Sequence, residues 1–456
     1  MLPHELLLDV FDHIRRSRHD PKFHHIPVWK WHVLVHVCRR WRHIVFASPF
    51  RLDLKLLCTY GTPVRKHLDC WPAFPIVVDY DTLRGLTPND EDNIIAALER
   101  PARIRQIKLK VPSSLCWNKI ATVMREPFPA LTSLTVSTWP PNVTLSIPVG
   151  FLGGCAPSLR EIQFRDFPSL TLPTLFLHTS DLVKLDLMDC DARLTGCVSL
   201  AGLIVCLAML PKLKSLSIGV SLLLTTENWQ MFLPRTIRVV LPALTSFWFE
   251  GGCTYLEDFV ASIDTPELDS VDITFLDSHH DYQISQLSEF LNRTALKPSL
   301  IEDANLYFDR CDEATIDLKH GTGRTPFSVN VPLCEGINYQ LWSVAQVLRQ
   351  TSAMLSNVYD LEIVAGSREE GDEDMDNIYW PELLGPFTAV ETLYVYADSD
   401  FAESIAHALE DTQMLPALTL LYFKGVGVGA IAESIVLPGR HWTIIDYEEL
   451  KSEEDD

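Results

Sequence analysis

The chain has 456 residues, of which 47% are hydrophobic and 21% are charged, a composition typical of a soluble globular protein. Its formal net charge of −22 is unevenly distributed, because residues 1–70 carry a balance of +6 and the remaining residues carry −28. So acidic a body repels phosphate groups, which argues against nucleic acid as its partner.

Membrane insertion and secretion are not expected either. The most apolar run, Val198–Leu210, is shorter than the about 20 residues that a transmembrane helix needs. Met1 leads directly into an amphipathic helix with acidic residues, and no signal peptide is recognisable. The 11 cysteines are scattered without a Cys-x-x-Cys pair. They predict reduced thiols in a cytoplasmic or nuclear protein.

The first 45 residues contain two apolar stripes at helical spacing. Pro3 favours a helix start, and the first stripe follows it as Leu6, Leu7, Val10, Phe11 and Ile14. The second stripe consists of Leu34, Val37, Cys38, Trp41, Ile44 and Val45. A segment this short can hardly bury both stripes on itself, so a remaining apolar face predicts a partner.

Two motifs in this segment, Leu-Pro-x-Glu-x-x-x-x-Val-Phe from Leu2 and Val-Cys-Arg-x-Trp-Arg from Val37, resemble the F-box family. The resemblance implies a three-helix module that docks on the small acidic adaptor of SCF-type ubiquitin ligases and, through it, on a cullin scaffold. The implied adaptor-binding residues are Leu2, Pro3, Leu6, Leu7, Val10, Phe11, Ile14, Leu34, Val37, Cys38, Trp41 and Ile44. Pro3 and Trp41 lie 38 residues apart, a few more than expected, which suggests an insertion around Asp20–Pro27. A helical hairpin packed on the rest of the protein is the alternative.

Residues 47–75 are apolar enough to predict a tightly joined helical linker rather than a flexible tether. Ile76–Tyr80 then predicts a first strand. Thr87 followed by Pro88 and acidic residues predicts a helix start, and Ile94, Ile95 and Leu98 predict its buried face. The expected organisation is an F-box-like module in 1–46, the linker in 47–75, repeats in 76–445 and an acidic tail in 446–456.

A repeat of three apolar residues dominates residues 76–445. The second apolar residue lies three positions after the first, and the third lies two positions after the second. The copies begin at Ile104, Leu131, Leu159, Leu182, Leu213, Leu244, Leu268, Val358, Val390 and Leu418. The last two apolar positions of each copy predict a strand, and helical periodicity between copies predicts one helix per unit. Six copies have a proline two residues before the first apolar residue, which we expect to stop the preceding helix and favour extended backbone.

The repeat resembles irregular leucine-rich repeats, and the expected fold is α/β: a three-helix F-box followed by a solenoid of parallel strands and helices. Of the Asn or Cys ladder typical of that family, only Cys190 is in place. Copies are spaced by 23 to 32 residues except across 268–358, where a copy near Leu300–Phe308 and a strand at Phe327–Val331 are expected. Two open α/β layers are the alternative.

Catalytic, cofactor and metal motifs are not persuasive in this sequence, and we expect a non-enzyme without cofactor or metal. His320–Thr325 lacks the spacing and lysine of a phosphate loop, and a turn is expected. The pair His32 and His36 favours a solvated helix face, and Asp277–Asp281 favours a polar loop. Buried thiols, rather than zinc ligands, are expected at Cys190, Cys197 and Cys206.

Outward positions of the repeat strands are the candidate target-binding residues. They combine aromatic and acidic side chains, which favours a basic protein partner, at Asp186, Trp248, Glu250, Asp272, Glu362, Tyr394, Tyr396 and Tyr422. Gln163, Arg165 and Met188 occupy equivalent positions. The expected function is substrate recognition in an SCF-type ubiquitin ligase, leading to ubiquitin-dependent degradation of the target. A non-catalytic repeat scaffold without a ligase role is the alternative.

Overall fold

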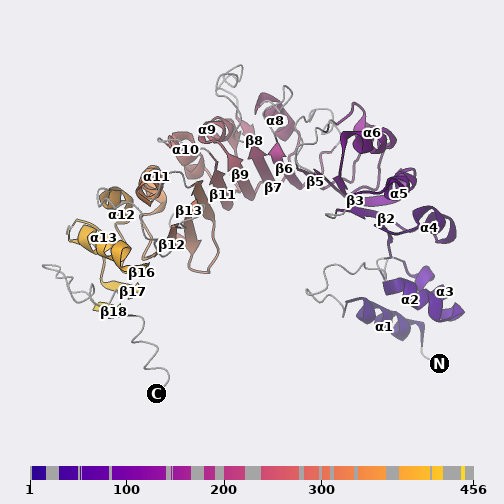
Figure 1. Ribbon diagram of the computed structural model, residues 1–456, viewed down its shortest axis with the longest axis horizontal. Helices are drawn as coiled ribbons and strands as arrows, with labels where there is room; N and C mark the ends of the chain where they lie inside the picture. Colours follow the sequence, from indigo (N-terminus) through magenta and orange to yellow (C-terminus); the bar gives the residue numbers. More distant parts are fainter. Residues whose placement is uncertain are drawn as a thin grey trace. The chain divides into compact units, whose positions relative to one another are not determined.

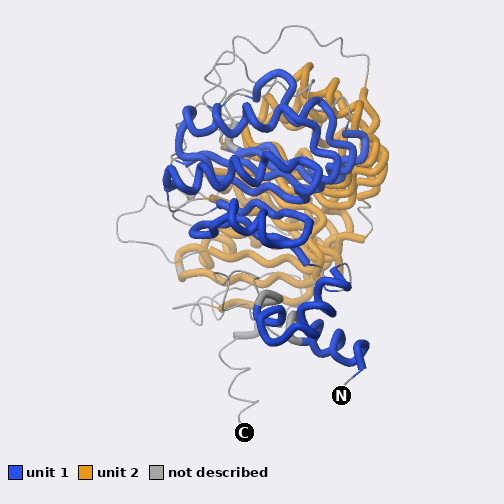
Figure 2. The backbone as a smooth tube through the Cα atoms, turned by 90° about the vertical axis from the view of Figure 1, so that its right-hand side faces the viewer, with its two compact units in different colours: residues 1–198 blue, residues 199–456 orange. Residues whose placement is uncertain are grey.

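The computed structural model divides into two compact units, residues 1–198 and residues 199–456 (Figure 2). It describes residues 3–16, 30–49, 52, 54–81, 85–139, 145, 147–165, 179–190, 200–220, 238–276, 282–296, 300–308, 313–332, 337–365, 379–410, 413–424 and 443–446. Leu2, Asp20–Pro27, Cys197, Asp277–Asp281 and the acidic tail from Tyr447 lie outside these ranges. Each unit is mixed α/β with a mostly parallel sheet.

The first unit begins with three helices, α1 (His4–Arg16), α2 (Lys30–Val37) and α3 (Arg39–Ala47) (Figure 1). The carbonyl of Pro3 accepts a hydrogen bond from the Leu7 N–H at 3.2 Å, which starts α1. The second apolar stripe is divided between α2 and α3 because Cys38 is extended, with φ −160° and ψ 169°. The Cys38 Sγ accepts from the Trp41 N–H at 3.4 Å and caps α3.

The segment 47–75, predicted as a helical linker, contains a strand as well as a helix. It holds β1 (Leu56–Cys58) and α4 (Val64–Cys70), and β1 pairs in parallel with β2 (Ile76–Tyr80). The Leu56 side chain is fully buried in this pairing. The sheet therefore begins before the first predicted strand.

The sheet of the first unit has the parallel order β1-β2-β3-β4-β5-β6. Its other strands are β3 (Ile104–Val111), β4 (Ser133–Thr138), β5 (Glu161–Arg165) and β6 (Lys184–Cys190). The helices α4, α5 (Pro88–Leu98) and α6 (Ser114–Val123) lie on one face of the sheet (Figure 1). The predicted start of α5 is confirmed, since Thr87 and Asp90 form a reciprocal capping box.

All ten predicted repeat copies coincide with strands. The three apolar residues of every copy are buried, each at most 4% exposed, so every copy contributes to the interior of its unit. Strands that carry the copies in the second unit are β7 (Ser215–Val220), β9 (Ser246–Gly251), β11 (Ser270–Phe275), β15 (Asp360–Ala365), β16 (Thr392–Tyr396) and β17 (Leu420–Lys424).

The repeat prolines have a different role from the predicted one. In all six copies the first apolar N–H donates to the carbonyl three residues earlier, as from Leu131 to Phe128 at 3.2 Å and from Leu418 to Leu415 at 3.0 Å. Each proline is therefore the second residue of a β-turn, where its fixed φ is favourable. It shapes a turn rather than committing the chain to extended backbone.

Backbone hydrogen bonds join successive turns where the Asn or Cys ladder is missing. The Thr245 carbonyl, for example, accepts from the N–H groups of Asp269 and Ser270, both at 3.1 Å. Threonine hydroxyls add to this ladder, as when the Thr245 Oγ1 donates to the Lys214 carbonyl at 3.2 Å. The turns are thus satisfied without polar side chains of the usual type.

A wholly parallel sheet was the wrong expectation for the second unit. Its order is β7-β9-β11-β14-β13-β12-β15-β16-β17-β18, and β13 is antiparallel to both neighbours. These strands are β12 (Ile301–Phe308), β13 (Glu313–His320), β14 (Phe327–Pro332) and β18 (Thr443–Asp446). The two strands expected in the long gap are present as β12 and β14. The third, β13, joins them into a meander that reverses the order of the strands.

The helices of the second unit lie on one face of its sheet (Figure 1). They are α8 (Leu200–Leu207), α9 (Cys253–Ala261), α10 (Ser285–Asn292), α11 (Ile337–Gln350), α12 (Trp380–Leu384) and α13 (Ser399–Leu409). The short strands β8 (Val239–Val240) and β10 (Ile263–Asp264) form a separate parallel pair. Within the described ranges, none of these or the other helices has the length and apolar character needed to cross a membrane.

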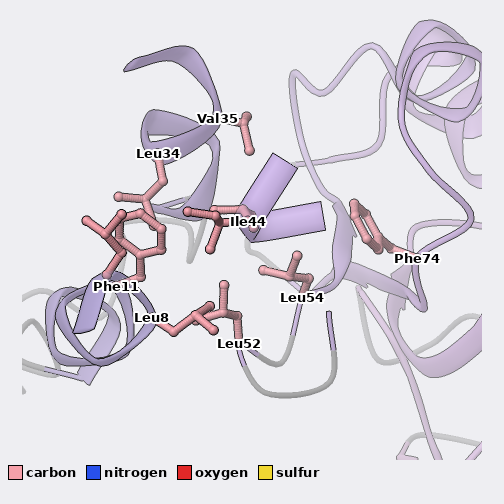
Figure 3. Close-up of a cluster of buried hydrophobic side chains, with 10 residues drawn as sticks. Leu8, Phe11, Leu34, Val35, Ile44, Leu52, Leu54 and Phe74 are labelled. Carbon is pink, nitrogen blue, oxygen red and sulfur yellow. The ribbon is translucent and has the colours of Figure 1, made fainter. Parts of the chain in front are cut away.

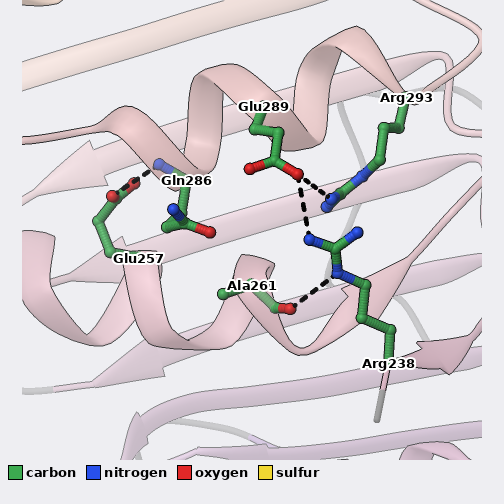
Figure 4. Close-up of polar contacts among 6 residues, drawn as sticks. All are labelled: Arg238, Glu257, Ala261, Gln286, Glu289 and Arg293. Carbon is green, nitrogen blue, oxygen red and sulfur yellow. Dashed lines mark hydrogen bonds and ion pairs between the residues drawn. The ribbon is translucent and has the colours of Figure 1, made fainter. Parts of the chain in front are cut away.

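Glu257 of α9 caps the neighbouring helix α10 (Figure 4). Its carboxylate accepts from the backbone N–H groups of Gln286 and Leu287, both at 2.8 Å, whereas the residue at the N-cap of α10, Ile284, provides no side-chain cap. Burial raises the pKa of Glu257, and these hydrogen bonds oppose the shift. Beside this cap, Glu289 accepts from Arg238 at 3.1 Å and from Arg293 at 2.9 Å.

We expect the substitution Glu257→Ala to destabilise α10 by about 1–2 kcal/mol, because it leaves two helix N–H groups without their acceptor. Hydrogen exchange of the α10 amides measures this loss. The control Asp258→Ala, on the adjacent position of α9, should change the stability by less than about 0.5 kcal/mol. Equal protection of α10 in both variants would contradict the capping role.

Candidate interaction surfaces

Four of the twelve predicted adaptor-binding residues lie inside the protein. Leu7, Phe11, Leu34 and Ile44 are at most 6% exposed. They form one cluster with Leu8, Val35, Val45, Leu52, Leu54 and Phe74 (Figure 3). The partly buried Trp41 ring packs on Phe11, with ring centroids 4.8 Å apart. These side chains hold the three helices together and onto the following segment, and the buried ones have no surface to offer a partner.

A different set of apolar residues on α1 and α2, called the exposed stripe below, faces outward. Leu6 and Val10 of α1 are 49% and 44% exposed, and they lie four residues apart on one helix face. Val33 and Val37 of α2 repeat this spacing at 68% and 55% exposed. Sequence reasoning missed Val33, although its spacing from Val37 was a usable signal. Pro3 and Cys38 are also exposed, whereas the Ile14 side chain lies outside the described part of α1.

The residues predicted to bind a target are divided between the two units. Asp186 lies on β6 in the first unit and is 6% exposed. Its Oδ2 accepts from the Gln163 Nε2 at 2.8 Å, in a cross-strand row that also contains Thr135. Arg165 and Met188 form the next pair of that face. Asp186 thus supports the sheet of the first unit, and the other seven residues belong to the second unit.

Five of those seven residues lie in one row across the sheet of the second unit. The register places Trp248, Asp272, Ser328, Asp317, Asn305, Glu362, Tyr394 and Tyr422 side by side on successive strands. Glu250 and Tyr396 lie in the next row. The three residues that sequence reasoning missed come from the meander β12–β14. Their outward direction could not be assigned without knowing the order of those strands.

Polar and aromatic contacts fix the side chains of this row. The Asn305 Nδ2 donates to the Glu362 Oε2 at 2.8 Å, and the Ser328 hydroxyl donates to the Asp317 Oδ1 at 2.7 Å. The Tyr394 and Tyr422 rings are stacked, with centroids 4.8 Å apart and planes at 13°. Such contacts reduce the rotamer freedom that binding would otherwise have to restrict.

Carboxylates on this face are held close to one another. Burial raises the pKa of Asp272, and the charges of Asp317 and Glu313 raise it further. Burial and the neighbouring Asp360 likewise raise the pKa of Asp303. Asp303 and Asp360 are direct cross-strand partners on adjacent parallel strands, about 5 Å apart. A cation placed on this face would relieve their repulsion.

The remaining chemical candidates take structural positions. His320–Thr325 forms the predicted turn, in which Gly323 has a φ of +79° and donates to the His320 carbonyl at 2.7 Å. Cys206 is buried as predicted, and burial raises the pKa of its thiol to about 11. His36 is exposed on α2, and the side chains of His32 and Cys190 lie outside the described set. Within that set, no group of three His, Cys, Asp or Glu side chains is arranged to hold a metal ion. No protein-family model and no curated protein matches this chain.

Proposed function

We propose that this chain is the substrate-recognition subunit of an SCF-type E3 ubiquitin ligase in the cytoplasm or nucleus. The F-box-like helices α1–α3 would dock on the acidic adaptor and through it on the cullin scaffold. The strand–helix units, which resemble irregular leucine-rich repeats, would bind the target. The chain itself would catalyse no reaction; it would raise the effective concentration of target lysines near the conjugating enzyme.

The observation that carries this proposal is the exposed stripe of apolar residues on α1 and α2. These helices already have a filled interior, so Leu6, Val10, Val33 and Val37 are not needed for their core. Four well-exposed apolar side chains on so small a module favour an interaction site there. The positive balance of residues 1–70 favours encounter with an acidic adaptor, mainly through the rate of association.

The double substitution Leu6→Asp with Val10→Asp tests the proposal. It places two charges in the apolar stripe without entering the core, and we expect capture of the SCF adaptor to fall by at least about a hundredfold. The measurement is co-purification and titration calorimetry with the full chain. The control His43→Asp introduces a negative charge at an exposed position of α3 and should leave capture within about threefold. Unchanged adaptor binding by the double variant would refute the docking site.

The alternative is a repeat scaffold in which the helices α1–α3 have only a structural role. A specific contact favours it. Leu52, Leu54 and Phe74 belong to the same buried cluster as the helices α1–α3, so a shared core joins these helices to the following segment (Figure 3). Removal of residues 1–46 would expose these side chains. A soluble, folded fragment 47–456 that no longer captures the adaptor supports the ligase role, and a full chain that ignores the adaptor supports the scaffold.

A further inference from the structure

The sheet face of the second unit that lies opposite its helices is strongly acidic. Burial alternates along β9, β11, β13, β15 and β16, so that one set of side chains is buried and the other is mostly half-buried. The half-buried set contains Lys319 and the carboxylates Glu250, Asp272, Asp303, Glu313, Asp317, Asp360 and Glu362, and Lys424 is exposed on the same face. The same face carries the aromatic residues Trp248, Tyr307, Tyr394, Tyr396 and Tyr422.

The corresponding face of the first unit has a different charge balance. Its carboxylates Asp79, Glu161 and Asp186 are accompanied by Lys108, Lys110, Arg165 and Lys184. Two of these cations are already engaged, since the Lys108 ammonium lies 2.8 Å from Asp81 and that of Lys110 lies over the Trp139 ring at 4.8 Å. Excess negative charge is thus a property of the second unit's face, rather than of every repeat.

Aromatic rings lie beside carboxylates at one end of the acidic face. Glu362 has Asn305 as its cross-strand neighbour on one side and Tyr394 on the other, and Tyr394 stacks on Tyr422. Asp360 lies on the same strand face, two residues before Glu362. The face also shows how it holds a cation, because the Lys424 ammonium lies over the Tyr396 ring, 5.8 Å from its centroid.

We propose that this acidic–aromatic face binds an arginine-containing, basic segment of a partner protein. A planar guanidinium can stack on a tyrosine ring while it forms paired hydrogen bonds with a carboxylate, and a lysine ammonium cannot do both in one plane. The face offers rings and carboxylates on adjacent strands at the strand spacing of about 5 Å. Only the identification of this segment as part of the ubiquitination target rests on the proposed function.

The test uses the full chain and a fluorescein-labelled peptide of repeated Gly-Ser-Arg units. The isosteric variant Asp360→Asn with Glu362→Gln should weaken this peptide by about tenfold in fluorescence anisotropy. Its matched control, Glu382→Gln with Glu403→Gln, removes the same charge from exposed positions of α12 and α13 and should change binding by less than about twofold. Equal weakening by both pairs would reduce the effect to general attraction by an acidic chain and overturn the proposal.

Two further comparisons separate recognition of arginine from recognition of charge. Tyr394→Ala should weaken the arginine peptide about fivefold, and Tyr394→Phe, which keeps the stacked ring, should restore most of the affinity. A Gly-Ser-Lys peptide should bind more weakly than the arginine peptide, and a neutral citrulline peptide should not bind. Equal affinity for the arginine and lysine peptides, or no loss in Tyr394→Ala, contradicts the stacking geometry.

The outcome is independent of the ligase role. The variants of the acidic face should capture the SCF adaptor as the unaltered chain does, because their substitutions lie in the second unit. If Leu6→Asp with Val10→Asp leaves adaptor capture intact while the peptide results hold, the proposed function fails and the arginine site stands. If that variant loses adaptor capture while the peptide results fail, the arginine site is refuted and the proposed function stands.

Discussion

Replacing Phe11 by alanine is expected to destabilise the α1–α3 helices by about 3–5 kcal/mol, the usual cost of emptying a buried aromatic site. The Phe11 side chain is fully buried, and its ring packs on Trp41 in the cluster that also joins the helices to Leu52 and Phe74. Hydrogen exchange of the α1 and α3 amides measures the loss. Because so short a helical module is marginal without its core, we also expect adaptor capture to fail.

Leu6→Ala is the matched control for this prediction. Leu6 lies on the same helix but is 49% exposed, so its truncation should change stability by less than about 0.5 kcal/mol while still weakening adaptor capture. The two variants together separate a loss of fold from a loss of contact. Equal loss of amide protection in both would mean that the exposed stripe is part of the core of the free protein.

The adjacent residues Leu6 and Leu7 show the limit of what helical periodicity can predict. Leu6 and Leu7 both belong to an apolar stripe, and spacing alone does not decide which of two adjacent positions is buried. The decision comes from Leu52, Leu54 and Phe74, which lie far along the chain and pack on the Leu7 side of the helix. The existence of the helices was therefore predictable, and the division into core and surface was not.

The repeat strands were predictable because two constraints coincide in each copy. The apolar alternation requires a buried strand face, and in six copies a proline marks the turn before it. The antiparallel pairing of the meander β12–β14 was not predictable, because apolar residues alternate in the same way in parallel and antiparallel strands. Strand direction there depends on the turn at Gly323 and on pairing with β11 and β15 across more than thirty residues of sequence.

The residues of the candidate binding face were likewise predictable only in part. Outward residues of single strands, such as Trp248 and Tyr394, could be selected from alternation within one copy. Their neighbours could not, because Asp317 and Asn305 join the row only through the reversed strand order. The amino-acid composition predicted an excess of negative charge. That this charge gathers on one face of the second unit depends on which strands pair and in what register.

Trp380→Ala is the second large effect, at about 3–5 kcal/mol in the second unit. Trp380 is fully buried at the start of α12, and its ring meets Phe401 of α13 edge-on, with centroids 5.3 Å apart. Its Nε1 donates to the Ser404 hydroxyl at 2.8 Å, which joins the two helices by a buried hydrogen bond. Urea unfolding followed by hydrogen exchange of the α12 and α13 amides measures the change.

Two smaller substitutions divide this loss between packing and hydrogen bonding. Trp380→Phe keeps most of the apolar volume and removes the indole donor, so it should cost about 1–2 kcal/mol, and Ser404→Ala should cost about 1 kcal/mol. The remainder of the alanine effect is then cavity formation between α12 and α13. If Ser404→Ala proves as costly as Trp380→Ala, the hydrogen bond rather than the ring dominates the joint. The lost protection should remain within the second unit, because Phe401 and Ser404, the residues that contact the ring, both belong to it.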